Sequence, residues 1–244
     1  MSRFFAYGCS FTKYYYPTWA DIIINDHDEG YNCGRLGSGN QLIANRICET
    51  NAVKKFNSDD TIIIMWSNFF RDDVYKDKDG WQTKGNIFFY KDNVEDLSHY
   101  VYRDCNLITS TLYSLRTTGA TVVSTSINNP YNDDLMLQDK NICNILDRYE
   151  PWVRPQTKTL QEHCWYPNIH KDKTRPQVCI DTLWQIEDHP LPLEHCDFVE
   201  NVLQYSISEK TARLASEWHA RLRSKELLRY DRIFEAGKTI DWVI

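Results

Sequence analysis

The sequence lacks the features that mark several classes of protein. Its eight cysteines form no Cys-x-x-Cys pair, and scattered cysteines of this kind are typical of reduced, buried side chains. The longest apolar run covers only Ile62 to Trp66, whereas a membrane-spanning helix needs about 20 apolar residues. The amino end carries neither a basic segment nor a long apolar one. We therefore expect a soluble, cytoplasmic protein without disulfides and without a membrane partner.

Clustered positive charge of the kind that binds nucleic acid is also scarce. The net charge is −6 and the isoelectric point is near 5.6. Basic residues do gather between Arg213 and Arg232, but Glu217, Glu226 and Asp231 are interleaved with them, which is typical of a solvated helix face. Since nucleic-acid binding requires a Lys/Arg-rich face, we predict no nucleic-acid partner.

Motifs that hold cofactors or metals are missing as well. There is no phosphate loop of the Gly-Lys-Ser/Thr kind, and the glycines between Asn32 and Asn40 do not follow the dinucleotide-binding spacing. His163, Cys164 and His170 could be zinc ligands, but no fourth ligand stands at a recognisable spacing from them. We predict that the protein uses no cofactor and no metal.

What the sequence does contain is the material of a folded α/β protein. Its 244 residues are 42% hydrophobic and 25% charged, and no linker or internal repeat divides them, which predicts a single domain over residues 1–244. Apolar patterns predict strands at 3–7, 61–66 and 120–127, and helices near 19–24, 42–47, 97–115, 134–149, 192–203 and 208–232. This alternation predicts a three-layer α/β/α sandwich with a mainly parallel sheet.

Two segments interrupt the alternation. Residues 71–92 are charged and aromatic, and Asp79-Gly80 is a turn signal between two short strands, so we predict an insertion near the functional site. Residues 150–176 are rich in proline, tryptophan, histidine and charge and have no clear period. We predict that this second segment is an irregular excursion.

The first candidate for chemistry is Ser10, which follows the first strand in a sharp Gly8-Cys9-Ser10 turn. A serine at this place points its hydroxyl beyond the carboxyl end of the sheet, where α/β proteins place their sites. This position predicts that Ser10 is a nucleophile. The alternative interpretation is that Ser10 or Thr12 caps the helix that follows, which is a use about as frequent for these residue types.

Two later segments carry further candidates. Asn68 follows the strand that ends at Trp66, where its side chain could donate an N–H to an oxyanion or satisfy the turn backbone. Near the carboxyl end, His189 follows Glu187 and Asp188, and a carboxylate beside a histidine can fix the imidazole tautomer. In an extended segment, residues two apart face the same side, so Glu187 is better placed than Asp188 to support the histidine.

Taken in order, these features resemble one known family. An early serine, a Gly-rich loop, an asparagine after the next strand and an acid-histidine pair near the end are similar to the motifs of the SGNH (GDSL-type) hydrolases, which have a flavodoxin-like α/β fold. The His-Pro pair and the run from Trp66 to Arg71 look like the branch found in bacteria and their phages. The resemblance covers nearly the whole chain.

The resemblance implies a role for each matching residue. Ser10 would be the nucleophile and His189 the general base, with Glu187, or alternatively Asp188, as the supporting acid. The oxyanion hole would combine the Ser10 N–H, the Asn68 side chain and a backbone N–H of Gly37 or Gly39.

Two residues compete for these roles. His195 is a rival base, but it falls in or near a helix, where we expect it to pack or to cap. Cys9 is a rival nucleophile, but it precedes the turn residue and should point back into the sheet.

The function implied by the resemblance is hydrolysis of a carboxylic ester through a Ser10 acyl-enzyme. The substrate would be a small-molecule or glycan ester, and O-deacetylation of a glycan is favoured because aromatic cleft walls suit sugars as well as acyl chains. The segments that could form such walls are Tyr14–Tyr16, Phe69–Phe70, Phe88–Tyr90 and Trp165–Tyr166.

Two other functions stay open at this point. Trp66 and Phe69 replace the residues that usually flank the asparagine in that family, and Glu187 replaces the usual acid arrangement, which would also fit a non-catalytic binding or virion-associated module. Transfer of the acyl group to another alcohol would use the same residues. A phage-encoded chain would act in the host cytoplasm or in the virion. Nothing in the sequence indicates an oligomeric state.

Overall fold

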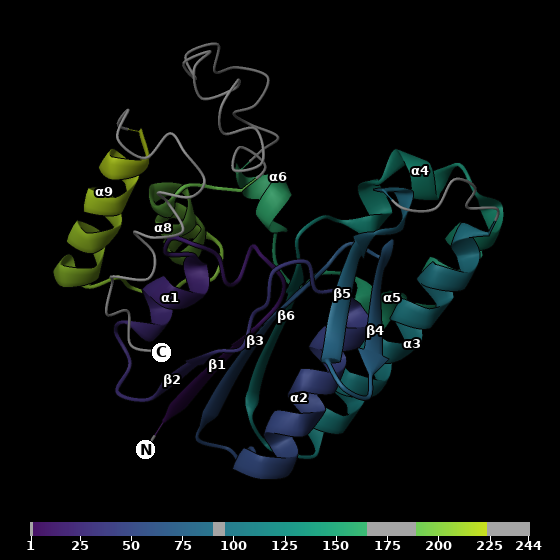
Figure 1. The fold of residues 1–244 in the computed structure, drawn as a ribbon, viewed down its shortest axis with the longest axis horizontal. Helices are drawn as coiled ribbons and strands as arrows, with labels where there is room; N and C mark the ends of the chain where they lie inside the picture. The colour runs from purple at the N-terminus through teal and green to yellow at the C-terminus, as the bar shows by residue number, and fades with distance from the viewer. Residues whose placement is uncertain (1, 90–95, 165–188, 224–244) are drawn as a thin grey trace.

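The centre of the molecule is a parallel sheet. A computed structural model describes residues 2–89, 96–164 and 189–223, and its four parallel strands lie in the order β2-β1-β3-β6 (Figure 1). These strands are β1 (Arg3–Tyr7), β2 (Gly30–Asn32), β3 (Asp60–Trp66) and β6 (Thr121–Ser126). Because β1 and β3 are paired in parallel, the segments that follow them leave the sheet at the same edge.

Side chains of the central strands alternate between two cores. In β1, Phe5 and Tyr7 face one core, whereas Phe4 and Ala6 face the other. In β3, Ile62, Ile64 and Trp66 join the first core, and Ile63 and Met65 join the second. This is the two-residue period of a strand that is buried on both faces, and it explains why β3 reads as a continuous apolar run.

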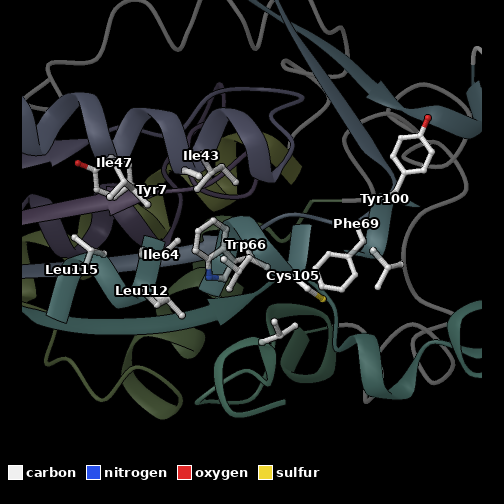
Figure 2. Close-up of a cluster of buried hydrophobic side chains, with 14 of the residues drawn as sticks. Tyr7, Ile43, Ile47, Ile64, Trp66, Phe69, Tyr100, Cys105, Leu112 and Leu115 are labelled. Carbon is white, nitrogen blue, oxygen red and sulfur yellow. The ribbon is translucent and has the colours of Figure 1, made fainter. Parts of the chain in front are cut away.

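Two sets of helices cover the two faces. The first core packs against α2 (Asn40–Lys54), α3 (Leu97–Arg116) and α5 (Lys140–Val153), and the second against α1 (Trp19–Ile24), α6 (Leu160–Cys164), α8 (Pro192–Asn201) and α9 (Glu209–Arg223). Figure 1 shows the two sets on opposite sides of the sheet. Figure 2 shows side chains of the first core, among them Ile43 of α2, Leu112 of α3 and Ile64 of β3. The predicted three-layer α/β/α fold with a parallel sheet is confirmed.

The predicted insertion at 71–92 contains an antiparallel hairpin. Strands β4 (Arg71–Lys76) and β5 (Gly80–Asn86) pair across the turn, where Gly80 has a φ of 66°. The short helix η1 (Ile87–Phe89) follows, and Ile87 returns the chain to the first core. Because Arg71 pairs with Asn86, these two residues stand at the open end of the hairpin.

The expected single helix over 134–149 is wrong. The chain instead forms η2 (Pro130–Asn132), α4 (Asp134–Leu137) and α5. Asp139 separates the last two helices because its side chain accepts hydrogen bonds from the backbone N–H groups of Asn141, at 2.7 Å, and Ile142, at 3.3 Å. These bonds cap a new helix start.

The irregular excursion expected at 150–176 is also corrected in part. Helix α5 runs on to Val153 with Pro151 inside it, and α6 occupies Leu160–Cys164. Burial of Val153 and stacking of the Arg116 guanidinium on Trp152, 4.1 Å from its ring centroid, hold this last turn of α5 against α3. Residues 165–176 lie outside the described residues.

The remaining differences lie at short or terminal elements. Strand β2 was not predicted, since three residues are too few to show an alternating pattern. The helix expected over 192–203 ends at Asn201, and the last helix is described from Glu209 to Arg223. Within the part of the chain that the structure describes, no helix has both the length and the apolar character needed to cross a bilayer.

Candidate active site

Ser10 stands at the carboxyl end of β1 in a turn that only glycine allows. The turn is closed by the N–H groups of Thr12 and Lys13, which donate to the Cys9 carbonyl at 3.0 and 3.1 Å. A Cβ on Gly8 would lie 2.0 Å from the Thr12 Oγ1 atom, so the close approach excludes any larger residue. The N-cap of α1 is Thr18, so neither Ser10 nor Thr12 caps that helix. Ser10 lines an open cleft instead.

His189 contacts Ser10 directly, although 179 positions separate them in the sequence. Its Nε2 atom lies 2.7 Å from the Ser10 Oγ atom. The imidazole is stacked between two rings, with centroids 4.3 Å from that of Phe11 and 4.2 Å from that of Tyr14, at interplanar angles of 17° and 11°. The Tyr16 hydroxyl donates to the His189 carbonyl at 3.4 Å. His189 is therefore held by aromatic side chains of the loop that begins at Ser10.

The protonation state of His189 suits a proton acceptor. Burial, and after it the positive charge of Arg71, lowers the pKa of His189 to about 3. The imidazole is therefore neutral near pH 7, and Nε2 can accept the Ser10 hydroxyl proton. Among the described residues, none hydrogen-bonds to the His189 Nδ1 atom. Glu187 and Asp188 lie outside the described residues, so the choice between them as supporting acid stays a prediction.

Asn68 and Gly37 line the same cleft. The Asn68 Oδ1 atom accepts the Phe70 N–H at 2.7 Å. The donor group of this side chain is its Nδ2 amide NH2. Gly37 has a φ of 74°, a left-handed conformation that suits glycine. Gly39 donates its N–H to the Asp73 carboxylate at 3.0 Å. Of the two candidate glycines, Gly37 therefore lines the cleft, whereas the N–H of Gly39 is already bonded to Asp73.

A buried polar network, not found from the sequence, fixes the turn that carries Asn68. The Asn40 side chain accepts the Ser67 N–H at 2.7 Å and donates to the Ser67 carbonyl at 3.1 Å. It also donates to Asp104 at 2.9 Å, and Arg103 donates to the same carboxylate at 2.7 Å. Burial raises the pKa of Asp104 to about 7, although the hydrogen bonds from Arg103 and Asn40 act to lower it. The asparagine directly after the Gly-rich loop was the available signal.

Several polar side chains also line the cleft, although most of its surface is apolar. Besides the residues above it includes Arg71 and Asn86 of the hairpin, Asn128 after β6, and Gln161 of α6. A second pocket shares Asn128 and Gln161 and continues along α4. None of these amide side chains was singled out from the sequence, because each comes from a different element and follows no local motif.

Among the described residues of the four segments predicted to form aromatic walls, Tyr14 is the one that stacks on His189. Tyr14 lies against His189, whereas Phe69 and Phe70 are buried in the first core. Phe88 is partly exposed and contacts Phe70 at a centroid distance of 5.3 Å. Trp165–Tyr166 lies outside the described residues.

The rival residues are placed elsewhere. Cys9 is fully buried and belongs to the second core. His195 is fully buried in α8, and neither of its ring nitrogens has a hydrogen-bond partner in the described part of the chain. Within that part, no group of three or more His, Cys, Asp or Glu side chains could hold a metal. His163 pairs with Asp197 at 2.5 Å, and His170 lies outside the described residues.

Comparison of the chain with models of known protein families and with curated proteins gives no match.

Proposed function

We propose that the protein is a serine hydrolase that cleaves a carboxylic ester at Ser10. The observation that carries the proposal is the 2.7 Å contact between the Ser10 hydroxyl and the His189 imidazole in an open cleft. A nucleophile within hydrogen-bond reach of a neutral histidine is the arrangement that activates serine. Gly37 and Asn68 line the same cleft, so donors for an oxyanion stand beside the nucleophile.

The reaction would proceed in two halves. In the first, the Ser10 Oγ atom bonds to the ester carbonyl carbon while its proton passes to His189 Nε2. The bond between the carbonyl carbon and the alkoxy oxygen then breaks, and the leaving alcohol takes that proton. In the second half, water gives a proton to His189 and attacks the acyl-enzyme, which releases the carboxylic acid and restores Ser10. Gly37 and Asn68 would stabilise the oxyanion of each tetrahedral intermediate.

The resemblance to the SGNH hydrolases supports the same assignment. The serine follows β1, the Gly-rich loop precedes α2 and the asparagine follows β3, which is the order that the resemblance implies. Trp66 and Phe69 differ from the usual flanking residues, and Asn40 holds the turn that carries Asn68.

We propose a small-molecule or glycan ester as the substrate. Amide side chains such as Asn86, Asn128 and Gln161 both donate and accept hydrogen bonds, which suits the hydroxyl groups of a sugar. Asn128 and Gln161 also line a second pocket next to the cleft. Removal of an O-acetyl group from a glycan is one such reaction. A cytoplasmic location stays a prediction from the sequence.

The test is labelling with a fluorophosphonate probe, followed by location of the adduct by mass spectrometry. We expect labelling of the intact protein at Ser10, and loss of labelling in Ser10→Ala and in His189→Ala. Ser126→Ala is a matched control, because Ser126 is also a buried serine at the carboxyl end of a strand but bonds to the Asn128 carbonyl. A folded protein that resists the probe would overturn the proposal and favour a binding module.

A second measurement separates hydrolysis from acyl transfer. Product analysis of a cleaved ester in the presence of an added alcohol should show free acid as the main product. Formation of a new ester in preference to acid would replace hydrolysis by transfer with the same residues.

A further inference from the structure

Arg71 gives the described lining of the Ser10 cleft a charge opposite to that of the whole molecule. The chain has a net charge of −6, yet the described residues that line the Ser10 cleft include this arginine and no aspartate or glutamate. The carboxylates of Asp133 and Asp134 line the neighbouring pocket instead. A cleft with one sign of charge and partly apolar walls concentrates ligands of the opposite sign.

The guanidinium of Arg71 makes no ion pair within the described part of the chain. Its Nη1 atom donates to the Ser38 carbonyl at 3.3 Å, and its Nε atom is buried with no partner there. The carboxylates of the two acidic residues that follow it make their hydrogen bonds elsewhere, although the charge of Arg71 is one of the influences that lower the pKa of Asp73 against the larger effect of burial. Asp72 accepts from Arg103 at 2.7 Å, and Asp73 accepts the N–H groups of Gly39 and Leu42 at 3.0 and 2.9 Å.

The backbone of Arg71 is nevertheless fixed. Its carbonyl accepts a hydrogen bond from Arg103 at 2.7 Å, and its strand partner is Asn86. Gly39 packs so closely that a Cβ there would lie 3.0 Å from the Arg71 Cβ atom. An arginine held in place, partly buried and without a hydrogen-bonded carboxylate among the described residues is prepared to bind an anion, because the ligand offsets the lost hydration of the guanidinium.

We propose that the substrate is an anionic ester, and that Arg71 binds its anionic oxygen group next to Ser10. The proposal rests on the ester hydrolysis proposed above and adds the class of ester. The planar guanidinium fork matches a carboxylate, and equally the oxygens of a sulfate or phosphate group.

Binding of an anion would also make His189 easier to protonate. The positive charge of Arg71 acts on His189 and opposes protonation of its imidazole. An anionic group paired with Arg71 would screen that charge, so the imidazolium that forms when Ser10 attacks would be stabilised. The preference for an anionic ester should therefore extend to kcat and not be confined to KM.

The experiment compares matched esters with the intact protein. On the alcohol side, para-acetoxybenzoate is compared with methyl para-acetoxybenzoate, and on the acyl side the para-nitrophenyl monoester of glutaric acid is compared with para-nitrophenyl pentanoate. In one of these pairs we expect kcat/KM to favour the anionic ester by about 10- to 100-fold, as charge-assisted hydrogen bonds provide. The preference should fall at high salt.

Three variants locate the effect. Arg71→Gln should abolish the preference, measured as the ratio of anionic to neutral ester within the variant, and Arg71→Lys should retain part of it. Lys84→Gln is the matched control, since it removes a positive charge from an exposed position of the same hairpin without touching the cleft. Its ratio should equal that of the wild type. Equal rates for both members of both pairs, with esters still hydrolysed, would overturn the anion site and leave the esterase.

A binding measurement separates the two proposals if no ester is hydrolysed. Titration calorimetry with benzoate should show at least tenfold tighter binding to the wild type than to Arg71→Gln. This result without hydrolysis would keep the anion site and overturn the esterase. Equal affinity of the two proteins would overturn the anion site.

Discussion

The two halves of the cleft are held by different forces. On the side of the proposed oxyanion hole, Asn68 rests on a turn that Asn40, Asp104 and Arg103 fix through hydrogen bonds of 2.7 to 3.1 Å. On the base side, His189 is stacked between Phe11 and Tyr14, and no described residue bonds to its Nδ1 atom. Hydrogen-bond networks fix atoms in direction and distance, whereas stacking fixes a plane.

This difference fits what each half must do. An oxyanion donor contributes only if it already points to the place where charge develops, so it gains from a rigid support. In the proposed reaction, His189 exchanges a proton first with Ser10 and then with the leaving oxygen, so its Nε2 atom needs small movements within the ring plane. Aromatic neighbours permit such movements and also favour the imidazolium through their π faces. The comparison predicts distinct responses to mutation on the two sides.

The largest effect is expected at the oxyanion donor. Asn68→Ala should lower kcat by about 100- to 1000-fold, because one preorganised donor is lost, while KM changes little. Steady-state kinetics on the preferred ester would measure both constants, and fluorophosphonate labelling of Ser10 would show that the nucleophile is intact. A rise in KM at unchanged kcat would mean that Asn68 binds the substrate rather than the transition state.

The next prediction tests the buried hydrogen-bond network that fixes the turn of Asn68. Asp104→Ala should lower the free energy of unfolding by about 3 kcal/mol, because it leaves the charge of Arg103 and the Asn40 amide without their buried partner. Asp72→Ala is the matched control, since it removes a carboxylate from the same arginine at a partly exposed position, and it should destabilise by about 1 kcal/mol or less. Urea denaturation measures both. Equal losses would show that burial of Asp104 is not what fixes this half.

The sequence predicts the sheet well because its signals are local. The run from Ile62 to Trp66 reads as a doubly buried strand, and the glycine before the Cys9-Ser10 turn reads as a tight end of β1. The network around Asn40 joins residues 27 and 64 positions apart, and no periodicity encodes such contacts. The contact of His189 with Ser10 is foreseen only through a family resemblance. Arg71 was missed because a charged residue at a strand start is usually solvated.

Helix α8, which begins shortly after His189 and carries the buried His195, should make the His189 side of the molecule the more sensitive to acid. Burial, and after it the charge of His189, lowers the pKa of His195 to about 3 from an ordinary value of 6.5. Such a histidine binds protons more readily in the unfolded chain, so its contribution to stability is full above pH 6.5 and declines as the pH falls toward 3. Between pH 7 and pH 5 the loss should be about 2 kcal/mol for this one group.

Urea denaturation of the wild type and of His195→Leu at both pH values would measure this loss. The variant should lose about 2 kcal/mol less than the wild type over that interval. Buried carboxyls with a raised pKa, such as Asp104, change the free energy of unfolding in the opposite direction over this interval. Their contribution is the same in both proteins, so it cancels when the variant is compared with the wild type. If the free energy of unfolding fell equally in the two proteins, His195 would be protonated in the folded state, and its buried site in α8 would tolerate charge.

The smallest expected effect tests whether ring stacking supports His189. Tyr14→Leu removes one of the two rings that face His189 and should lower kcat by about tenfold, because a cation–π contact to the imidazolium is lost. Tyr14→Phe keeps the ring and should stay within about twofold of the wild type. In Tyr14→Leu the pKa of His189 should also fall, so the acid limb of the kcat profile should move to lower pH as the plateau drops. A lower plateau with an unmoved limb would indicate simple loosening of the loop. An equal loss in both variants would assign the effect to the hydroxyl group of Tyr14, and the stacked rings would then be packing alone.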